Sequence, residues 1–200
     1  MPRSLKTEVR KIENTKPKQK PLVILLAGLP GTGKSTLARN LAYKYALEHI
    51  STDSVRKRIF RYVKHEDFGK GSYSATQRQV VYDTINYVLY TLLKYGKGCV
   101  LDGTYYLERL RSKVQRICYR WDARFFLVIV QCPDSISKKR FEERAKKNRR
   151  TLSDANWSVY EKFKQIFEPT NLHHINVNVT NDYREIVRKI DNVIKKYSIK

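Results

Sequence analysis

Residues 28–36 combine glycines, a lysine and hydroxyl side chains at a spacing suited to holding phosphate groups, G-x-x-x-x-G-K-[ST]. Glycines let the backbone curl around phosphate oxygens with its N–H groups pointing inward. Lys34 would reach the β- and γ-phosphates and assist catalysis, while the Ser35 hydroxyl would ligate Mg²⁺. We predict an ATP and Mg²⁺ site formed by Gly28, Leu29, Pro30, Gly31, Thr32, Gly33, Lys34, Ser35 and Thr36.

Asp53 follows a short strand candidate, residues 48–51, and precedes Arg56 by one helical turn. A carboxylate facing the γ-phosphate could accept the proton of a substrate hydroxyl, and Arg56 could hold substrate or neutralise charge. Asp is also a common helix N-cap, because its oxygens accept the unpaired N–H groups of a first turn. The two roles are compatible, and we predict catalytic roles for both residues.

Asp102 lies at the end of another predicted strand, residues 99–101, and is followed by Gly103 and Thr104. An acid at this place in a P-loop enzyme holds Mg²⁺, together with the P-loop serine or through water. The alternative is a turn, since Asp-Gly is a common turn dipeptide. The strand-end position favours Asp102 as a second metal residue beside Ser35.

The segment 138–150 carries eight Lys or Arg residues against two Glu residues. Such a run is often a solvated helix face. Here it follows a strand, and Arg140 and Arg144 are four residues apart on one helix face. We predict a lid at about 138–152 whose two arginines stabilise the transferring phosphate.

Two further groups have open interpretations. A basic stripe on a predicted helix, Arg109, Lys113, Arg116 and Arg120, is either a solvated face or a track for a phosphate backbone. Three loop tyrosines, Tyr73, Tyr105 and Tyr106, could stack on bases or serve as packing residues.

These residues need a scaffold, and the sequence supplies alternating apolar runs and helix-period stretches. Strands are predicted at 22–27, 48–51, 99–101, 125–131 and 174–179, and helices at 33–47, 53–63, 75–95, 107–121, 135–147, 154–167 and 183–197. Five apolar strands separated by helices predict an α/β fold with a mainly parallel sheet covered on both faces. Ligands bind such sheets at the carboxyl ends of the strands.

Composition limits the classes of protein. The chain has 200 residues with 41 Lys and Arg against 19 Asp and Glu, a formal charge of +22, which favours polyanionic partners. Residues 1–20 hold seven basic and two acidic residues and are predicted to be a flexible tail, leaving a domain at 21–200. The longest apolar run, 21–28, is too short to cross a membrane, and the three cysteines and four histidines lack metal-ligand spacing. We expect a cytoplasmic protein without a transition metal.

Five segments together resemble the small P-loop kinases of the polynucleotide-kinase, zeta-toxin and seryl-tRNA-kinase-like group. They are GLPGTGKST at 28–36, STDSVR at 51–56, VLDGTYYLERLR at 100–111, the segment 140–144, and 153–169. The resemblance runs from about residue 22 to residue 169. It implies a three-layer P-loop NTPase fold with strand order 2-3-1-4-5.

By similarity to that group, Asp53 is the general base and Arg56 the substrate or phosphate clamp. The resemblance also places Asp102 at the metal and assigns Arg140 and Arg144 to the lid. Thr104 and Arg111 fall at positions that bind substrate. Several members carry a second acid where this chain has Gly103, so the chain is more similar to stand-alone kinases of unassigned substrate in the group.

The sequence thus predicts an enzyme that transfers the γ-phosphate of ATP to a hydroxyl. The strong positive charge makes the 5′-hydroxyl of RNA or DNA the leading acceptor, with a small hydroxylated metabolite or an aminoacyl-tRNA as alternatives. A hypothesis from another class is a nucleic-acid-binding ATPase switch that passes phosphate only to water. A basic scaffold protein with a vestigial site is a third.

Overall fold

The computed structural model describes residues 19–60, 74–146, 155–180 and 182–197. Along them one or two helices separate successive strands, in the order β1 (Leu22–Ala27), α2 (Lys34–Tyr45), β2 (Glu48–Ser51), α3 (Thr52–Ile59), α4 (Ala75–Lys94), β3 (Cys99–Asp102), α5 (Glu108–Arg120), β4 (Arg124–Gln131), α6 (Asp134–Lys146), α7 (Trp157–Ile166), β5 (His174–Asn178) and α8 (Tyr183–Lys196). The predicted tail up to residue 18 and the predicted lid beyond residue 146 lie outside the described residues.

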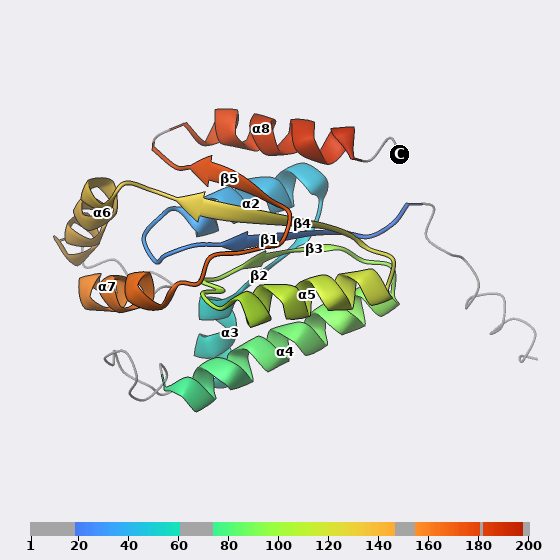
Figure 1. Cartoon of the computed structure of the whole chain (residues 1–200), viewed down its shortest axis with the longest axis horizontal. Helices are drawn as coiled ribbons and strands as arrows, with labels where there is room; N and C mark the ends of the chain where they lie inside the picture. The colour runs from blue at the N-terminus through green and yellow to red at the C-terminus, as the bar shows by residue number, and fades with distance from the viewer. Residues whose placement is uncertain (1–18, 61–73, 147–154, 181, 198–200) are drawn as a thin grey trace, which may run out of the picture.

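All five strands pair in parallel in the order β2-β3-β1-β4-β5, which confirms the predicted sheet. In the centre, Leu25 of β1 lies beside Leu101 of β3 and Leu127 of β4. The carboxyl ends of the strands therefore meet at one edge of the sheet, next to α6 and α7 (Figure 1). This edge is where the predicted site residues should gather.

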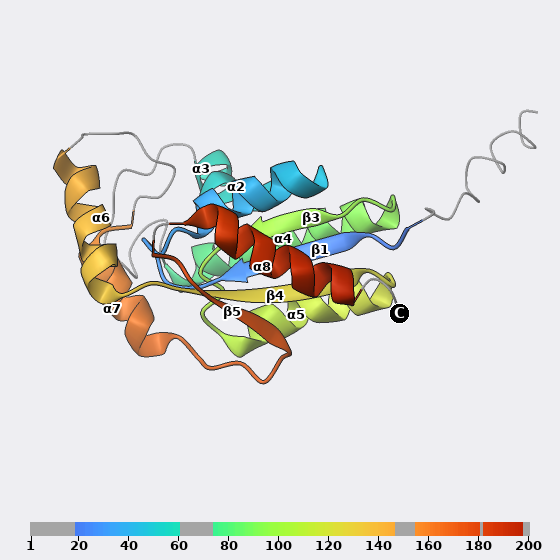
Figure 2. The same ribbon diagram turned by 90° about the horizontal axis from the view of Figure 1, so that it is seen from above.

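The central strand β1 is buried on both sides, and its alternating residues belong to two different cores. Val23 and Leu25 pack in the core under α4 and α5, whereas Ile24 and Leu26 pack in the core under α2 and α8. Each fully buried aliphatic side chain stabilises the fold by roughly 1.5–3 kcal/mol. The result is a three-layer arrangement, with α8 on one side of the sheet and α4 and α5 on the other (Figure 1). Seen from above, α8 lies across the strands (Figure 2).

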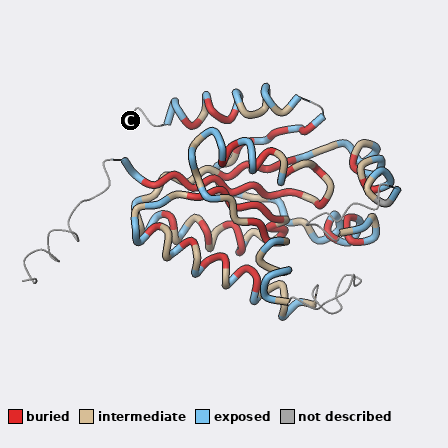
Figure 3. Tube along the Cα trace, turned by 180° about the vertical axis from the view of Figure 1, so that it is seen from behind, coloured by how far each residue is buried: buried red, intermediate tan, exposed pale blue. Residues whose placement is uncertain are grey.

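Burial along the chain follows this layering. β1 and β3 are buried throughout, and β2, β4 and β5 are buried in part. The flanking helices turn buried residues toward the sheet and leave exposed residues outside (Figure 3). α4, for example, buries Val81, Ile85 and Leu89 at helical spacing. None of the helices among the described residues is long and apolar enough to pass through a bilayer.

Candidate active site

The phosphate-binding loop (P-loop), residues 28–36, begins after β1 and ends in the first turn of α2, at the carboxyl edge of the sheet. Gly28 (φ 154°) and Gly31 (φ 79°) have backbone angles that favour glycine. A Cβ atom at Gly31 would stand 2.7 Å from Cε2 of Phe141, so a side chain at this position would have to displace the ring of Phe141 on α6. The glycines therefore let this loop curl tightly in front of the first turn of α2, as the sequence pattern predicts.

Lys34 is buried at the base of this loop. Its Nζ donates hydrogen bonds to the carbonyl oxygen of Leu29 at 2.5 Å and to the hydroxyl of Thr32 at 3.4 Å. Burial lowers the pKa of Lys34 from its ordinary value of 10.5 to about 8, although Asp102 and Asp53 nearby act in the opposite direction. The ammonium is thus poorly solvated, and phosphate oxygens would stabilise its charged form.

A cleft of about 390 Å³ opens beside the P-loop. It is lined by Pro30, Gly31, Gly33, Lys34, Ser35, Thr36, Arg39, His49, Ser51, Thr52, Asp53, Arg56, Arg78, Tyr82, Asp102, Gly103, Thr104, Arg144, Ala155, Val159 and Phe163. The structure thus brings together residues from six parts of the chain. Most of the predicted site residues outside the P-loop are among them.

Asp53 and Arg56 line the cleft as an ion pair. Nη1 of Arg56 donates to Oδ1 of Asp53 at 2.5 Å, which holds the carboxylate in one orientation. The N-cap of α3 is Ser51, whose hydroxyl accepts the N–H groups of Asp53 and Ser54. The alternative interpretation of Asp53 as an N-cap is therefore wrong, and its carboxylate remains available for chemistry.

Asp102 is the last residue of β3 and pairs in the sheet with Leu26 and Ser51, so the alternative of a turn residue does not hold. Its side chain is buried, and Nε2 of His49 lies 3.4 Å from Oδ2. Asp102 and Ser35 both line the cleft, and carboxylate and hydroxyl oxygens are ligands that Mg²⁺ accepts.

The described residues contain no group of three or more His, Cys, Asp or Glu side chains that could hold a metal ion. A cation with only one carboxylate ligand needs oxygens from elsewhere. Mg²⁺ commonly binds through one or two carboxylates plus substrate phosphates. The donor set of Ser35 and Asp102 therefore fits a magnesium ion that shares the phosphate oxygens of a nucleotide.

The two predicted lid arginines on α6 have different places. Arg144 lines the cleft, and burial together with the neighbouring charge of Arg140 lowers its pKa. Arg140 does not line the cleft. Its Nη2 donates to the carbonyl oxygen of Thr180 at 3.0 Å, and its Nη1 donates weakly to that of Gly31 at 3.4 Å. Arg140 thus braces the outside of the P-loop, which corrects the expectation that both arginines face the transferring phosphate.

Arg111 also departs from expectation, because its side chain has no exposed surface. Its guanidinium donates to the carbonyl oxygens of Tyr105, Glu168 and Pro169 at 2.7–2.8 Å and pairs with Glu108. Every side of the group is already occupied by protein. The prediction that Arg111 binds substrate is therefore wrong, and the residue ties the loop after β3 to the segment after α7.

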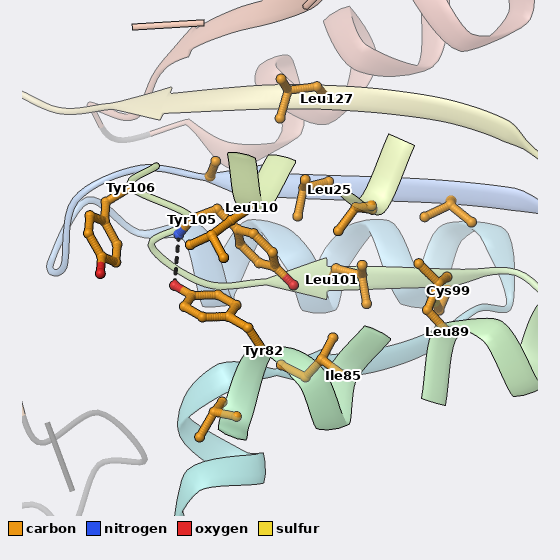
Figure 4. Packing of buried hydrophobic residues seen from close by; sticks show 14 of the residues in the cluster. Leu25, Tyr82, Ile85, Leu89, Cys99, Leu101, Tyr105, Tyr106, Leu110 and Leu127 are labelled. Carbon is orange, nitrogen blue, oxygen red and sulfur yellow. Dashed lines mark hydrogen bonds between the residues drawn. The ribbon is translucent and has the colours of Figure 1, made fainter. Parts of the chain in front are cut away.

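That loop carries Thr104 into the cleft, where its binding of substrate stays a prediction, while the two tyrosines that follow it are packing residues. Tyr105 and Tyr106 are nearly inaccessible, so the alternative that they stack on bases is wrong; Tyr73 lies outside the described residues. The hydroxyl of Tyr82 accepts the backbone N–H of Tyr105 at 3.2 Å (Figure 4). This bond connects α4 with the loop that presents Thr104.

Sequence reasoning missed His49 and the part of the cleft formed by α4 and α7, namely Arg78, Tyr82, Ala155, Val159 and Phe163. The sequence does contain a signal for two of these residues, Arg78 and Tyr82. Arg78 and Tyr82 are four residues apart, so they share a helix face, next to the buried residue Val81. Their facing the P-loop depends on how α4 packs on the sheet.

The basic stripe on α5 is partly paired with α4. Lys113 forms an ion pair with Asp83 at 2.8 Å, and Arg109 donates to Gln79 at 3.4 Å. Arg116 and Arg120 are exposed. A phosphate-backbone track on this face stays a prediction.

A family model described as an AAA domain matches residues 23–170 of the chain. Among curated proteins, an uncharacterized protein of Mycobacterium tuberculosis is 35% identical over 103 residues, which is 46% of this chain and 20% of that protein. The adenylate kinase of Halobacterium salinarum is 33% identical over 84 residues, 40% of this chain and 39% of that enzyme. The chain therefore spans less than half the length of either relative.

Solved structures share the fold at low sequence identity. The APS kinase CysC of Mycobacterium tuberculosis, in complex with AMPPNP and APS, superposes with a TM-score of 0.65 at 13% identity, covering 88% of this chain and 99% of that one. A gluconokinase from Sinorhizobium meliloti gives 0.64 at 16% identity, over 90% and 95%. Chaetomium thermophilum Kti12 in complex with ADP-AlF3 gives 0.64 at 20% identity, over 85% and 97%.

Proposed function

The chain belongs to a family of AAA domains, and we propose that it is an ATP-dependent kinase that transfers the γ-phosphate to a hydroxyl group. One observation carries this proposal: the P-loop lysine Lys34 and the carboxylate of Asp53 line the same cleft. A phosphate-binding loop alone would serve any nucleotide-binding protein. A carboxylate held beside it adds a group that can take up the proton of an acceptor.

In the proposed reaction, the acceptor oxygen attacks the γ-phosphorus in line while the bond to the β–γ bridging oxygen breaks and ADP leaves. Asp53 takes the proton from the acceptor hydroxyl, and its ion pair with Arg56 keeps the carboxylate oriented. Lys34 and Arg144 stabilise the negative charge of the transferring group. Mg²⁺, held by Ser35 and Asp102 with the phosphate oxygens, would neutralise the triphosphate.

For the acceptor, we propose the 5′-hydroxyl end of RNA or DNA as the leading candidate, because the chain carries a formal charge of +22. A small hydroxylated compound is the second candidate. It is favoured by the cleft volume of about 390 Å³, near the lower end of the roughly 300–1,000 Å³ of small-molecule pockets. The APS kinase and the gluconokinase of the same fold support this candidate too.

The test is incubation with γ-labelled ATP, Mg²⁺ and a panel of 5′-hydroxyl RNA, 5′-hydroxyl DNA, tRNA and small hydroxylated metabolites. Label on an acceptor supports a kinase, whereas release of free phosphate alone would support the ATPase switch instead. Asp53→Asn should lower transfer by about 10²–10⁴-fold and leave ATP affinity nearly unchanged. Asp83→Asn, an exposed acid of α4 outside the cleft, is the matched control and should retain transfer.

Equal transfer by wild type and Asp53→Asn would remove this carboxylate from the mechanism. Loss of transfer in both Asp53→Asn and Asp83→Asn would point to general charge or folding effects.

A further inference from the structure

Helices α4 and α5 lie next to each other on one side of the sheet, and the contacts between them fix how they are aligned (Figure 1). Arg109 of α5 donates to Gln79 of α4 at 3.4 Å, and Lys113 pairs with Asp83 at 2.8 Å. In both contacts the partners are 30 positions apart, so the helices run in the same direction. Residues further along the two helices can be matched by the same offset.

The second half of the helix pair keeps this alignment. The ring of Tyr90 on α4 meets that of Trp121 at the end of α5, with ring centres 5.3 Å apart. The offset places Arg116 of α5 beside the turn of α4 that carries Tyr87. In the same way, Arg120 lies beside the turn that carries Tyr90. Cationic and aromatic side chains from two helices therefore share one stretch of surface.

This stretch is basic and contains no acidic residue from either helix. Neither residues 84–97 nor residues 109–120 include Asp or Glu. Arg116, Arg120 and Lys94 are exposed, and across the described ranges none of the three forms an ion pair with an acid. The surface therefore attracts anions from solution.

Three tyrosine rings stand among these cations. Tyr87 and Tyr119 expose 72% and 88% of their surface, and Tyr90, whose ring contacts Trp121, exposes 41%. Tyr119 follows Arg116 by three positions, so the two are neighbours on the surface of α5. The α4–α5 patch, as we call this surface, consists of Tyr87, Tyr90, Lys94, Arg116, Tyr119 and Arg120, none of which lines the cleft.

Cations interspersed with exposed rings suit a strand of nucleic acid with unpaired bases. The cations neutralise backbone phosphates, and each ring offers a flat face on which any base can stack. In a duplex the bases already stack on one another, so rings on a protein surface do not reach their faces. An acidic protein would use the cations but leave the rings in water. A membrane would need a continuous apolar surface, whereas charges separate these rings.

We propose that the α4–α5 patch binds a single strand of RNA or DNA through its phosphates and bases. This inference goes beyond the proposed kinase function, because the patch lies outside the cleft and binding there requires no phosphate transfer. The two sites share α4: Tyr82 lines the cleft, and Lys94 lies twelve positions further along, about 18 Å at 1.5 Å per residue. In the proposed reaction, a strand whose 5′ end enters the cleft would continue along α4 to the patch.

Fluorescence anisotropy of 3′-labelled oligonucleotides, titrated with the full chain in the absence of ATP, tests the patch by itself. Oligouridine RNA and oligothymidine DNA are the single strands, and a duplex of the same length is the comparison. We expect the single strands to bind more tightly than the duplex, and the tighter of the two identifies the partner. Tyr87→Ala and Tyr119→Ala should each reduce the affinity at least about fivefold, because each removes a ring on which a base stacks.

Matched controls separate stacking from general effects. Tyr87→Phe and Tyr119→Phe keep the rings and should keep the affinity. Tyr43→Ala removes a ring that is 92% exposed on α2, on the other side of the sheet, and should leave the affinity unchanged. Circular dichroism and thermal unfolding verify that the alanine variants are folded.

The salt dependence of binding tests the cations. Each phosphate contact on a single strand contributes about 0.7 to the slope of log affinity against log salt concentration. The double variant Arg116→Gln/Arg120→Gln should therefore reduce the magnitude of that slope by about 1.4. Arg184→Gln/Arg188→Gln, at exposed positions of α8 outside the patch, should leave the slope unchanged.

Equal affinity for single strand and duplex, or alanine variants that bind as tightly as the wild type, would overturn the inference. Displacement of the oligonucleotide by polyglutamate at an equal concentration of charge would also overturn it, since the surface would then recognise any acidic polymer. Single-strand binding with the expected pattern but no transfer of γ-phosphate to a 5′-hydroxyl end would support the patch and contradict the leading acceptor of the proposed kinase.

Discussion

Replacing Lys34 by Met should stabilise the nucleotide-free protein while abolishing nucleotide binding. The pKa of Lys34 is lowered from 10.5 to about 8 because its charge is buried. Each pKa unit corresponds to ~1.4 kcal/mol, so the charged lysine costs the folded state about 3 kcal/mol at pH 7. Methionine has a similar unbranched shape and no charge. The variant lacks the hydrogen bond from Lys34 to the carbonyl oxygen of Leu29, and this loss reduces the gain in stability by about 1 kcal/mol.

The net gain of about 2 kcal/mol corresponds to a rise in Tm of roughly 4–8 °C for a chain of this size. The lowered pKa of Lys34 also determines how this difference in stability depends on pH. Below the folded-state pKa of about 8, Lys34 is charged in both states and the penalty is fully present. The penalty fades between pH 8 and pH 10.5, where the unfolded chain also loses the proton.

Urea unfolding of the wild type and Lys34→Met at pH 7 and pH 10 measures both effects. The variant should be the more stable protein at pH 7, and the difference should fall to near zero at pH 10. A variant less stable than the wild type at pH 7, or a difference in stability independent of pH, would refute the claim that the buried charge of Lys34 destabilises the nucleotide-free protein. Binding sites commonly lower the stability of the folded protein in this way, because their side chains are selected for function.

Two other substitutions test the scaffold around the cleft. Arg111→Met should cost about 3–5 kcal/mol in urea unfolding, because three carbonyl oxygens, of which that of Tyr105 is buried, lose their donor and Glu108 loses its ion-pair partner. A near-neutral change in stability with a raised acceptor KM would restore its role in substrate binding. Gly31→Ala should lower AMPPNP affinity, because its Cβ would stand 2.7 Å from Phe141 at a φ of 79°. Gly96→Ala at the end of α4 (φ 69°) is its control and should lose stability but keep that affinity; equal AMPPNP affinity in both variants would show that the P-loop does not need the close approach of α6.

The P-loop and the position of Asp53 and Asp102 in the cleft could be predicted from the sequence because their signals are local. The spacing of Gly28, Gly33 and Lys34 specifies a backbone path, and the apolar run before it specifies the strand. Asp53 comes just after β2 and Asp102 ends β3, and parallel strands bring their carboxyl ends to one edge. The strand order came from the family resemblance, and the observed sheet confirms it.

The predictions that the structure contradicts concern residues whose roles depend on contacts with residues far along the chain. Arg111 bonds to Glu168 and Pro169, 57 and 58 positions further along, and nothing within its helix indicates that burial. Arg140 shares a helix face with Arg144, yet a bond to Thr180 holds it outside the cleft. Arg78 and Tyr82 of α4 line the cleft beside the P-loop because of the way that helix packs on the sheet, which no local pattern specifies.

The most direct test of the account is a calorimetric titration of the full chain with ATP and Mg²⁺. We expect the wild type to bind one nucleotide per chain and Lys34→Met to show no measurable binding, although that variant is folded and stable. Absence of heat with the wild type, or undiminished affinity in Lys34→Met, would contradict the claim that this loop grips the triphosphate.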